Sequence, residues 1–220
     1  KGLNHNKNII ELFVEPIKEK VEYYAGQYFF ISFPNNSRIR SETHPFAIST
    51  APSESSRITI KIAGDYTESL LKAEAGDEIK LIGPFGEFHN NNFREYNSSI
   101  WVAGGIGITP FLAMLRERVL NNDQRKVYLV YGVNNESEAH YFEEIRNLIE
   151  GKDNFKFYEH FSDKEGFIDG QYLKSKTGED FFSSNIMICG PSKMMTSIQK
   201  SCLKLGKEKK DIFFENFSFK

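Results

Sequence analysis

The chain has 220 residues, of which 40% are hydrophobic and 26% are charged, so its composition excludes a disordered or collagen-like protein. Its 28 Lys and Arg against 30 Asp and Glu give a formal net charge of -2, which argues against nucleic acid as a partner. Its two cysteines, Cys189 and Cys202, are too few for a disulfide framework or an iron–sulfur cluster within the chain.

No uncharged apolar run reaches the roughly 20 residues that a membrane-spanning helix needs, so we expect the fragment itself to be soluble. The chain opens with Lys1 and has no apolar targeting segment near it, which indicates a piece excised from a longer polypeptide. The five histidines are widely separated in the sequence, so we expect no metal site.

Short apolar runs broken by turn residues fill the first part of the chain. We expect β-strands at 9–14, 28–33, 46–49, 58–62 and 79–82. At least five such strands at this spacing predict an antiparallel β-barrel. The polar stretch that follows them marks a domain boundary, which divides the chain into 1–95 and 96–220.

The second part of the chain alternates apolar runs with helical patterns. The expected strands lie at 100–103, 127–131, 155–161 and 186–189, with a last one from 212, and the expected helices lie at 110–120, 138–149 and 194–205. Apolar strands interleaved with helices are typical of a parallel sheet covered on both faces. The sequence therefore predicts an α+β two-domain protein, an antiparallel β-barrel followed by a doubly wound α/β domain.

A glycine-rich turn joins the strand 100–103 to the helix after it. Gly104, Gly105 and Gly107 let the backbone turn sharply and approach a ligand closely. Thr109 stands where it can cap the helix, and Pro110 suits its first turn. Backbone amides and the positive helix end would then cradle a pyrophosphate, although a plain tight strand-to-helix turn explains the same residues.

A second turn, Cys189-Gly190-Pro191-Ser192, follows the strand 186–189. Both turns stand at the carboxyl ends of parallel strands, the side on which open α/β sheets bind ligands. Cys189 has the chemistry of a nucleophile, but a free cysteine that ends a core strand is more often inert packing.

His44, Pro45 and Phe46 stand in one extended stretch of the first part of the chain. Because side chains alternate along an extended chain, we expect His44 and Phe46 to point the same way. A ring that can carry positive charge beside an aromatic ring suits a ligand with both a phosphate and a planar ring system.

Six motifs occur in one order along nearly the whole chain, namely His-Pro-Phe with Ile-Ser-Thr-Ala-Pro (44–52), Lys-Ile-Ala-Gly-Asp-Tyr-Thr (61–67), Gly-Pro-Phe-Gly (83–86), the glycine-rich turn (104–110), Cys-Gly-Pro (189–191) and Glu-Asn-Phe (215–217). This series resembles the ferredoxin–NADP reductase superfamily. Within it, the chain is most similar to the dehydrogenase domain of NADPH oxidases and ferric reductases, and above all to a bacterial NADPH oxidase homologue. The resemblance implies an FAD-binding domain over 1–95 and an NAD(P)-binding domain over 96–220.

The resemblance assigns FAD contacts to the first domain. His44 stands where the superfamily has an Arg on the FAD pyrophosphate, and Phe46 where an aromatic side chain packs on the flavin. Ala47 stands where the family usually has Ser or Thr hydrogen-bonded to flavin N5, so that contact is missing or comes from a backbone group. The other expected FAD contacts are Pro45, Ile48 and Ser49, the strand residues Lys61, Ile62 and Ala63 beside the isoalloxazine, and Gly64 and Thr67, which open a short pyrophosphate-binding helix.

The resemblance also assigns the nicotinamide side of the site. The turn Cys189-Gly190-Pro191 would guide the nicotinamide onto the flavin, with Met194 behind it. Phe217 is the expected aromatic that shields the flavin until the nicotinamide displaces it, with Phe219 as the alternative. A last core strand with exposed aromatic side chains is the structural explanation of the same segment.

The choice of coenzyme rests on the residues after the strand 155–161. Ser162 resembles the Ser that meets the 2′-phosphate of NADPH, while Asp163, in place of the usual Arg, favours the ribose hydroxyls of NADH. Lys164 can supply positive charge, so we expect NADPH as the coenzyme, with NADH also used.

The resemblance implies hydride transfer from NAD(P)H to FAD N5, followed by the release of single electrons. The expected partner is a haem-bearing transmembrane domain of the same polypeptide, with oxygen (giving superoxide) or ferric iron as the final acceptor. The fragment would then lie at the cytoplasmic side of the cell membrane. A free-standing flavin reductase, an electron-transfer subunit and a non-catalytic nucleotide-binding regulator are the alternatives.

Overall fold

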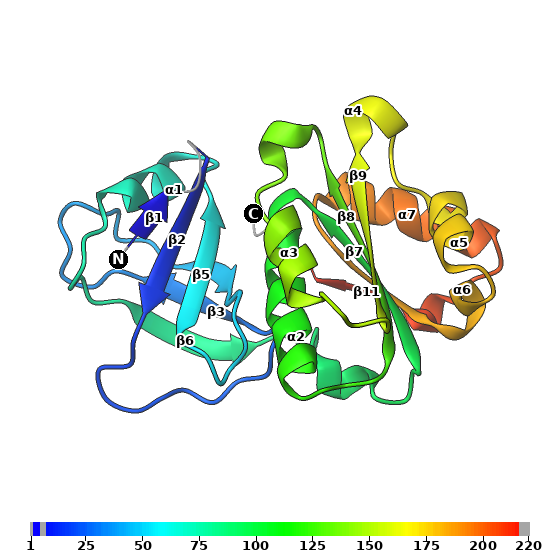
Figure 1. Ribbon diagram of the computed structural model, residues 1–220. Coiled ribbons are helices and arrows are strands. Elements are labelled where there is room, and N and C mark those ends of the chain that lie inside the picture. The colour runs from blue at the N-terminus through cyan, green and yellow to red at the C-terminus, as the bar shows by residue number, and fades with distance from the viewer. Residues whose placement is uncertain (1, 5–7, 216–220) are drawn as a thin grey trace.

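The computed structural model describes residues 2–4 and 8–215, which form two domains side by side (Figure 1). The first domain holds two three-stranded antiparallel sheets. One is ordered β1 (Gly2–Asn4), β2 (Ile9–Val14), β5 (Ser56–Lys61), and the other β4 (His44–Ala47), β3 (Tyr28–Ser32), β6 (Lys80–Phe85). A bridge between Ile48 and Ile58 links the two sheets.

One apolar core fills the space between these sheets. Phe29 of β3 and Ile58 of β5 are almost fully buried in it, because alternate residues of each strand face inward. Two short helices, α1 (Asp65–Ser69) and η1 (Leu70–Lys72), connect β5 to β6 and bring Leu70 onto the same core.

The second domain is built on a five-stranded parallel sheet in the order β11-β10-β7-β8-β9. Its strands are β7 (Ser98–Gly104), β8 (Lys126–Val133), β9 (Phe155–Phe161), β10 (Asn185–Cys189) and β11 (Ile212–Glu215). The chain adds strands on one side of β7 and then returns to add β10 and β11 on the other side. β7 and β10 are therefore the neighbours at which the strand order reverses.

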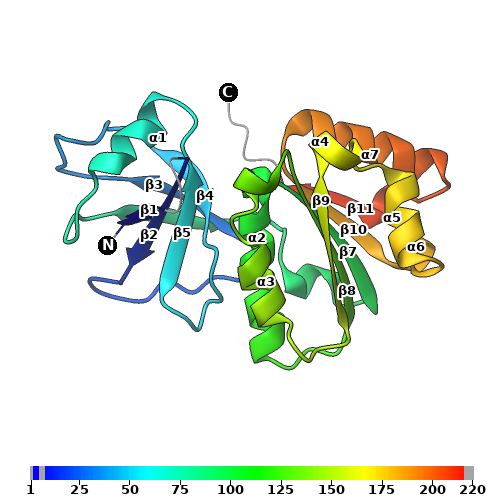
Figure 2. The same cartoon turned by 45° about the horizontal axis from the view of Figure 1, so that its top comes forward.

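Helices cover both faces of this sheet (Figure 2). α2 (Thr109–Leu120) and α3 (Phe142–Leu148) lie on the face towards the first domain, and α5 (Gly170–Thr177) and α7 (Ser192–Lys204) lie on the other. Alternation along β7 divides its side chains between the two cores, with Trp101 on the α2 face and Val102 on the α7 face. The remaining short helices are η2 (Asn90–Phe93), η3 (Gly105–Ile108), η4 (Glu136–Glu138), α4 (Ser162–Glu165), α6 (Asp180–Ser183) and η5 (Lys209–Asp211).

The predicted fold class is confirmed, with antiparallel sheets followed by a doubly wound α/β domain. Two strands agree with the prediction residue for residue, 9–14 as β2 and 155–161 as β9. Helices α4, α5 and α6 are absent from the sequence prediction, because the segment 162–184 has few apolar residues at helical spacing.

Most predicted boundaries differ from the structure by one or two residues, and two of them differ by three or more. The helix expected at 138–149 begins only at Phe142. The residues before it form the separate 3₁₀ helix η4, which starts where the Asn135 side chain accepts a hydrogen bond from the Ser137 amide. The strand expected at 79–82 continues to Phe85 as β6, although a Gly-Pro pair lies within it. β6 is an edge strand of its sheet, where the missing N–H of a proline costs no hydrogen bond between strands.

Candidate functional site

The carboxyl ends of β7 and β10 lie side by side at the point where the strand order reverses. Ala103 pairs with Cys189 in this parallel register, so the turns that follow the two strands begin next to each other. A crevice at such a reversal is the usual ligand site of an open α/β sheet. The structure thus brings together the two turns that the sequence singled out.

Close approach explains the glycines of these turns. A Cβ atom on Gly107 would lie 2.3 Å from the backbone oxygen of Cys189, which no real side chain can do. A Cβ on Gly104 would lie 2.6 Å from the Met194 sulfur and 3.0 Å from Pro191 Cδ. A Cβ on Gly190 would likewise lie 2.7 Å from Met194 Cε. These six residues therefore form one compact group.

The first turn differs from the prediction in one respect. Gly105 has φ +53° and opens the 3₁₀ helix η3, and Pro110 lies in the first turn of α2 as expected. Thr109 does not cap α2, because it is already the first helical residue, and its hydroxyl donates to the Ile106 carbonyl at 3.1 Å. Ile108 holds the capping position and has no side-chain oxygen to offer.

Cys189 is buried at the end of β10 rather than exposed on the surface. The side chain is 1% exposed, and burial, followed by the charge of Glu215, raises the pKa of its thiol well above the ordinary value. A thiol that stays protonated is a poor nucleophile. Cys189 therefore shapes the site through its backbone, which leaves its predicted contact with the nicotinamide a prediction.

The strand β4 presents His44 and Phe46 in different surroundings. The His44 ring stacks on Tyr66 of α1 with ring centroids 4.0 Å apart, and its Nε2 lies 2.8 Å from Glu42 Oε2. Phe46 is half-buried against the core of the first domain. Pro45 between them is also half-buried, so this short strand offers an imidazole ring and an apolar edge to a ligand.

The residues that follow Phe46 are less accessible. Ala47, Ile48 and Ser49 are all buried. The Ser49 hydroxyl donates to the Arg57 carbonyl at 3.0 Å and accepts from Arg57 Nε at 2.9 Å. Its hydrogen-bonding capacity is thus used within the protein, which leaves the backbone as the part of this stretch able to meet a ligand.

The stretch after β5 is open to solvent and ends in a helix, as expected. Lys61, Ala63 and Gly64 are exposed, and Ile62 is half-buried. The Thr67 hydroxyl accepts from the Ala63 amide at 2.8 Å and donates to the Gly64 carbonyl at 2.9 Å. This leaves the first-turn amides of α1 without partners inside the helix, a suitable arrangement for an anion.

Glu215, the last described residue, lies against the first domain. A Cβ on Gly86 would be 3.0 Å from Glu215 Oε2 and 3.2 Å from the Tyr28 ring. Burial and then the Glu215 charge raise the pKa of Tyr28. The carboxyl edge of the parallel sheet therefore meets β3 and β6, and Tyr28, Gly86 and Glu215 were not among the predicted site residues. The predicted Phe217 and its alternative Phe219 lie outside the described residues.

The carboxyl ends of β8 and β9 hold the expected coenzyme-selecting residues. The Ser162 hydroxyl donates to Asn134 Oδ1 at 3.3 Å, and the Asp163 amide donates to the Asn134 carbonyl at 3.1 Å. Lys164 pairs with Glu136 at 2.6 Å, which raises the pKa of Lys164 and lowers that of Glu136. Ser162 and Lys164 thus lie together at one edge of the site.

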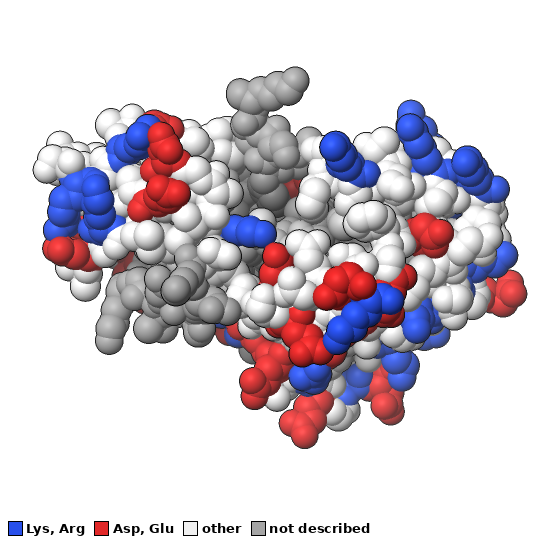
Figure 3. Space-filling model, turned by 90° about the horizontal axis from the view of Figure 1, so that it is seen from above, with Lys and Arg blue, Asp and Glu red and all other residues white. Residues whose placement is uncertain are grey.

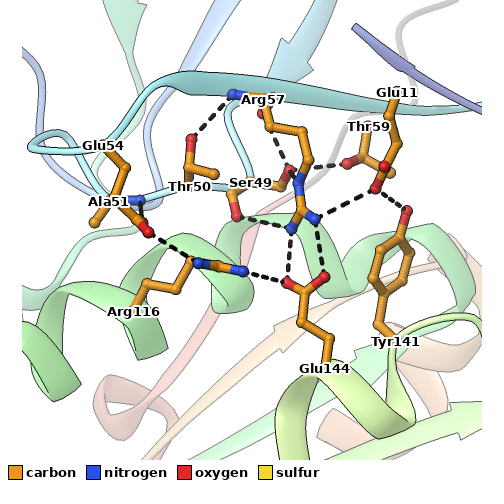
Figure 4. A network of polar contacts seen from close by, with 10 residues as sticks. All are labelled: Glu11, Ser49, Thr50, Ala51, Glu54, Arg57, Thr59, Arg116, Tyr141 and Glu144. Atoms are coloured by element: carbon orange, nitrogen blue, oxygen red, sulfur yellow. Dashed lines mark hydrogen bonds and ion pairs between the residues drawn. The ribbon is translucent and has the colours of Figure 1, made fainter. Parts of the chain in front are cut away.

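A buried polar network joins the two domains (Figure 4). Arg57 of β5 donates two hydrogen bonds to Glu144 of α3, at 2.8 and 2.7 Å. Arg57 Nη1 also lies 3.4 Å from Glu11 Oε1, which accepts from the Tyr141 hydroxyl at 3.0 Å. Arg116 of α2 donates to Glu144 at 3.0 Å and also reaches the first domain at Glu54, at 2.9 Å. The network fixes how the two halves of the site face each other.

The face that holds the site carries both signs of charge. Figure 3 looks down on this face and shows blue and red side chains interspersed rather than one positive field. Within residues 2–4 and 8–215, no helix is long and apolar enough to cross a membrane. In the same part of the chain, no three His, Cys, Asp or Glu side chains are grouped to hold a metal ion.

Both predicted cofactors fit the residues present. Gly104, Gly107 and Gly190 let the turns after β7 and β10 pack directly against each other at the carboxyl edge of the sheet, the place where an open α/β sheet binds a dinucleotide. His44 and the first turn of α1 supply a ring and backbone donors for the FAD pyrophosphate. The two sets belong to different domains that meet at Glu215 and Gly86.

Comparison with known families agrees with this arrangement. An FAD-binding domain family matches residues 3–95, and an oxidoreductase NAD-binding domain family matches residues 101–200. The chain belongs to the ferredoxin–NADP reductase superfamily. It is a flavin-dependent NAD(P)H oxidoreductase domain with FAD and NAD(P)H as its cofactors.

Individual relatives are longer than this chain, and nearly the whole chain aligns with a part of each. Flavohemoprotein B of Dictyostelium discoideum is 26% identical over 91% of this chain and 53% of the relative. The reductase component of propane 2-monooxygenase from Rhodococcus jostii (strain RHA1) is 26% identical over 96% of the chain and 60% of the relative. The chain thus spans little more than half the length of these curated relatives.

Solved structures share the fold of both domains. The flavohemoglobin of Malassezia yamatoensis, with bound FAD and heme, matches with a TM-score of 0.85 at 23% identity, over 99% of this chain and 58% of that one. The cytochrome b5 reductase domain of Ulva prolifera nitrate reductase matches with a TM-score of 0.79 at 18% identity, over 98% and 94% of the two chains.

Proposed function

We propose that this chain is the NAD(P)H dehydrogenase module of a haem-reducing enzyme. It takes a hydride from NADPH, or from NADH, and passes the electrons singly to a haem carried by another part of the same polypeptide. The observation that carries the proposal is the meeting of two cofactor sites. The crevice around Gly104, Gly190 and Met194 belongs to one domain, and Tyr28, which faces Glu215 across the boundary, belongs to the other.

The chain's own residues act by holding and orienting. Gly104 and Gly107 let the turns after β7 and β10 pack against each other, and Pro191 and Met194 lie against Gly104. These turns would hold the nicotinamide beside the flavin. Hydride transfer needs the two rings close together and in line, and it needs no side-chain acid or base. FAD, when bound, supplies hydride acceptance at N5 and the release of single electrons. The buried network of Arg57 and Glu144 keeps the two ring sites in register.

A haem in the same polypeptide is supported by the relatives. Two flavohemoproteins of Dictyostelium discoideum, A and B, align with 98% and 91% of this chain and have further sequence beyond it. The His44-Pro45-Phe46 motif favours a transmembrane haem domain of the NADPH oxidase or ferric reductase type, with oxygen or ferric iron as the final acceptor and superoxide as the product from oxygen. The chain would then work at the cytoplasmic side of the cell membrane.

A reductase component that serves a separate protein is the second candidate. The propane 2-monooxygenase reductase of Rhodococcus jostii aligns with 96% of this chain, which favours it. The two candidates differ in kinetics. Electron transfer to a haem on the same polypeptide is independent of protein concentration, whereas transfer to a separate protein rises with the concentration of that protein.

The test uses the complete polypeptide that contains this chain, purified with its bound cofactors and kept free of oxygen. Addition of NADPH should bleach the flavin absorbance and then reduce a haem, with a rate that does not change on tenfold dilution. A polypeptide without haem, or a flavin that stays oxidised with NADPH and with NADH, would contradict the proposal. Haem reduction that slows in proportion to dilution would favour the second candidate.

A further inference from the structure

A pocket of about 590 Å³ lies outside the cofactor crevice. It is bounded by Tyr24 of the first domain, by the turn 90–94 and by the segment 117–125. α2 starts at the carboxyl edge of the sheet and ends at the opposite edge, before β8, so the pocket lies at the far end of this helix from the nicotinamide turn (Figure 1). No residue predicted for FAD or NAD(P)H lines it.

Arg118 is the unusual residue of this pocket. It is 1% exposed, and its guanidinium carbon lies 5.1 Å from the centre of the Trp101 ring. Its Nε donates to Asn90 Oδ1 at 2.7 Å. Among the residues that the structure describes, Nη1 and Nη2 have no hydrogen-bond partner, although both are buried. Leaving several donors of a buried cation without acceptors is costly, so an acceptor from outside the described chain would stabilise Arg118.

The two acidic residues of the pocket leave Arg118 Nη1 and Nη2 without a hydrogen bond, although Asp123 forms a long ion pair with Arg118 Nε. Glu117 Oε2 is held by the Asn90 amide at 2.7 Å. Asp123 accepts hydrogen bonds from Arg125, and its Oδ2 is 3.8 Å from Arg118 Nε. Burial, followed by repulsion from Arg125, lowers the pKa of Arg118 to about 10. A bound negative charge would relieve both effects.

A further arginine and an aromatic ring complete the lining. Arg94 is exposed and donates a hydrogen bond to Asn91 Oδ1 at 2.6 Å. Tyr24 stacks on His89 with ring centroids 4.7 Å apart, and half of the Tyr24 side chain remains exposed. The pocket thus combines the guanidinium groups of Arg94 and Arg118 with side-chain amides and an exposed ring face.

We propose that this pocket binds the oxyanion group of a small molecule, a phosphate or a carboxylate, with Arg118 Nη1 and Nη2 as paired donors. The planar fork of an arginine matches two oxygens of such a group. Arg94 adds a second positive charge at the rim of the pocket, where solvent screens it. Because Tyr24 belongs to one domain and Arg118 to the other, the ligand would contact both domains.

The test titrates the FAD-loaded protein with inorganic phosphate, with acetate and with sodium chloride at matched ionic strength, and follows the midpoint of thermal unfolding. Phosphate or acetate should raise the midpoint above the chloride value, because a ligand of the folded state stabilises it. The stronger of the two anions identifies the phosphoryl or the carboxylate class. Equal midpoints in all three salts would overturn the proposal.

The variant Arg118→Met keeps the apolar stem over Trp101 and removes the donors. Its affinity for the preferred anion should fall about tenfold or more, the usual effect of lost hydrogen bonds to a charged group. The matched control is Arg146→Met, since Arg146 is an exposed arginine of α3 that pairs with Glu159. The control should bind the anion as the unchanged protein does. Equal loss in both variants would contradict the assignment to Arg118.

Two further measurements test the proposal if Arg118→Met fails to fold. Arg118→Lys keeps the charge but lacks the paired donors, so it should also lose most of the affinity. Crystals of the unchanged protein grown with the preferred anion should show it within hydrogen-bond distance of Nη1 and Nη2. Water molecules alone at these two nitrogens would overturn the proposal. Neither result depends on hydride transfer. The anion site can therefore be confirmed or refuted independently of the proposed function.

Discussion

The guanidinium of Arg57 in β5 faces the carboxylate of Glu144 in α3, so one two-pronged ion pair spans the boundary between the domains. Burial alone would raise the pKa of Glu144, but the hydrogen bonds and charge of Arg57, followed by those of Arg116, outweigh it and hold this pKa below its ordinary value. The pair lies on the side of the sheet where α2 and α3 face the first domain (Figure 4). Its partners therefore set the orientation on which both cofactor sites depend.

The first prediction concerns this pair. Glu144→Gln should lower the free energy of unfolding by about 3 kcal/mol, because it leaves the buried Arg57 charge without its main partner. Denaturant unfolding of the FAD-loaded protein measures the change. Arg146→Met on the same helix is the control and should change stability by less than about 1 kcal/mol, since its ion pair with Glu159 is exposed. Similar losses in both variants would contradict a special role for the Arg57 pair.

The second prediction is the pH dependence of the same contact. The pKa of Glu144 is lowered in the folded protein relative to its ordinary value of 4.5. The contribution to stability is therefore complete above about pH 4.5 and is lost as the pH falls through the folded value. Unfolding experiments from pH 7 to pH 3 should show a decline in the unchanged protein that Glu144→Gln reduces. If the free energy of unfolding fell equally with pH in both proteins, the Glu144 carboxylate would not be the source of this pH dependence.

The third prediction compares two glycines of the same turn. Gly107→Ala would push a methyl group onto the Cys189 carbonyl, 2.3 Å away, and should raise KM for NAD(P)H at least about tenfold by displacing the turn after β10. Gly105→Ala meets no atom within 4 Å and carries only the strain of φ +53°, about 1 kcal/mol. Steady-state kinetics separates the two. A larger KM effect from Gly105→Ala would contradict the packing argument.

Local patterns predicted much of this fold. The apolar run of β9 and the period-2 alternation of β5 depend on neighbours in sequence, and both strands formed where expected within two residues. The glycines at 104, 107 and 190 could also be singled out, because tight turns at strand ends leave a compositional trace. What these residues contact, such as Met194 against Gly104, follows only from the order of strands in the sheet.

Long-range pairing accounts for what the sequence did not predict. Ser49 was expected to meet a cofactor, yet its hydroxyl is engaged with Arg57 and Thr59, residues that adjoin it only once β4 and β5 approach. Glu144 and Arg118 carry no motif, since an exposed helix charge and a buried one look alike in sequence. Their significance comes from partners 87 and 28 residues away along the chain.

The fourth prediction concerns coenzyme choice. We expect kcat/KM for NADPH and for NADH to differ by less than about 100-fold, because Lys164 supplies a charge while Asp163 opposes the 2′-phosphate. Lys164→Met should lower kcat/KM for NADPH about tenfold and leave NADH nearly unchanged. Glu136→Gln frees Lys164 from its ion pair and should raise the preference for NADPH. Equal effects on both coenzymes would separate Lys164 from 2′-phosphate recognition.

The last prediction tests the aromatic residue expected over the flavin. Phe217 follows Glu215 by two residues in the sequence, and Glu215 lies against Gly86 and Tyr28 of the first domain. Phe217→Ala should lower KM for NAD(P)H about fivefold, because the nicotinamide no longer displaces an aromatic contact worth about 1 kcal/mol. The visible spectrum of the bound flavin should shift as well. Phe219→Ala is the control and should change neither KM nor the spectrum. The reverse result would assign the shielding role to Phe219, and no change in either variant would leave the flavin without a terminal aromatic.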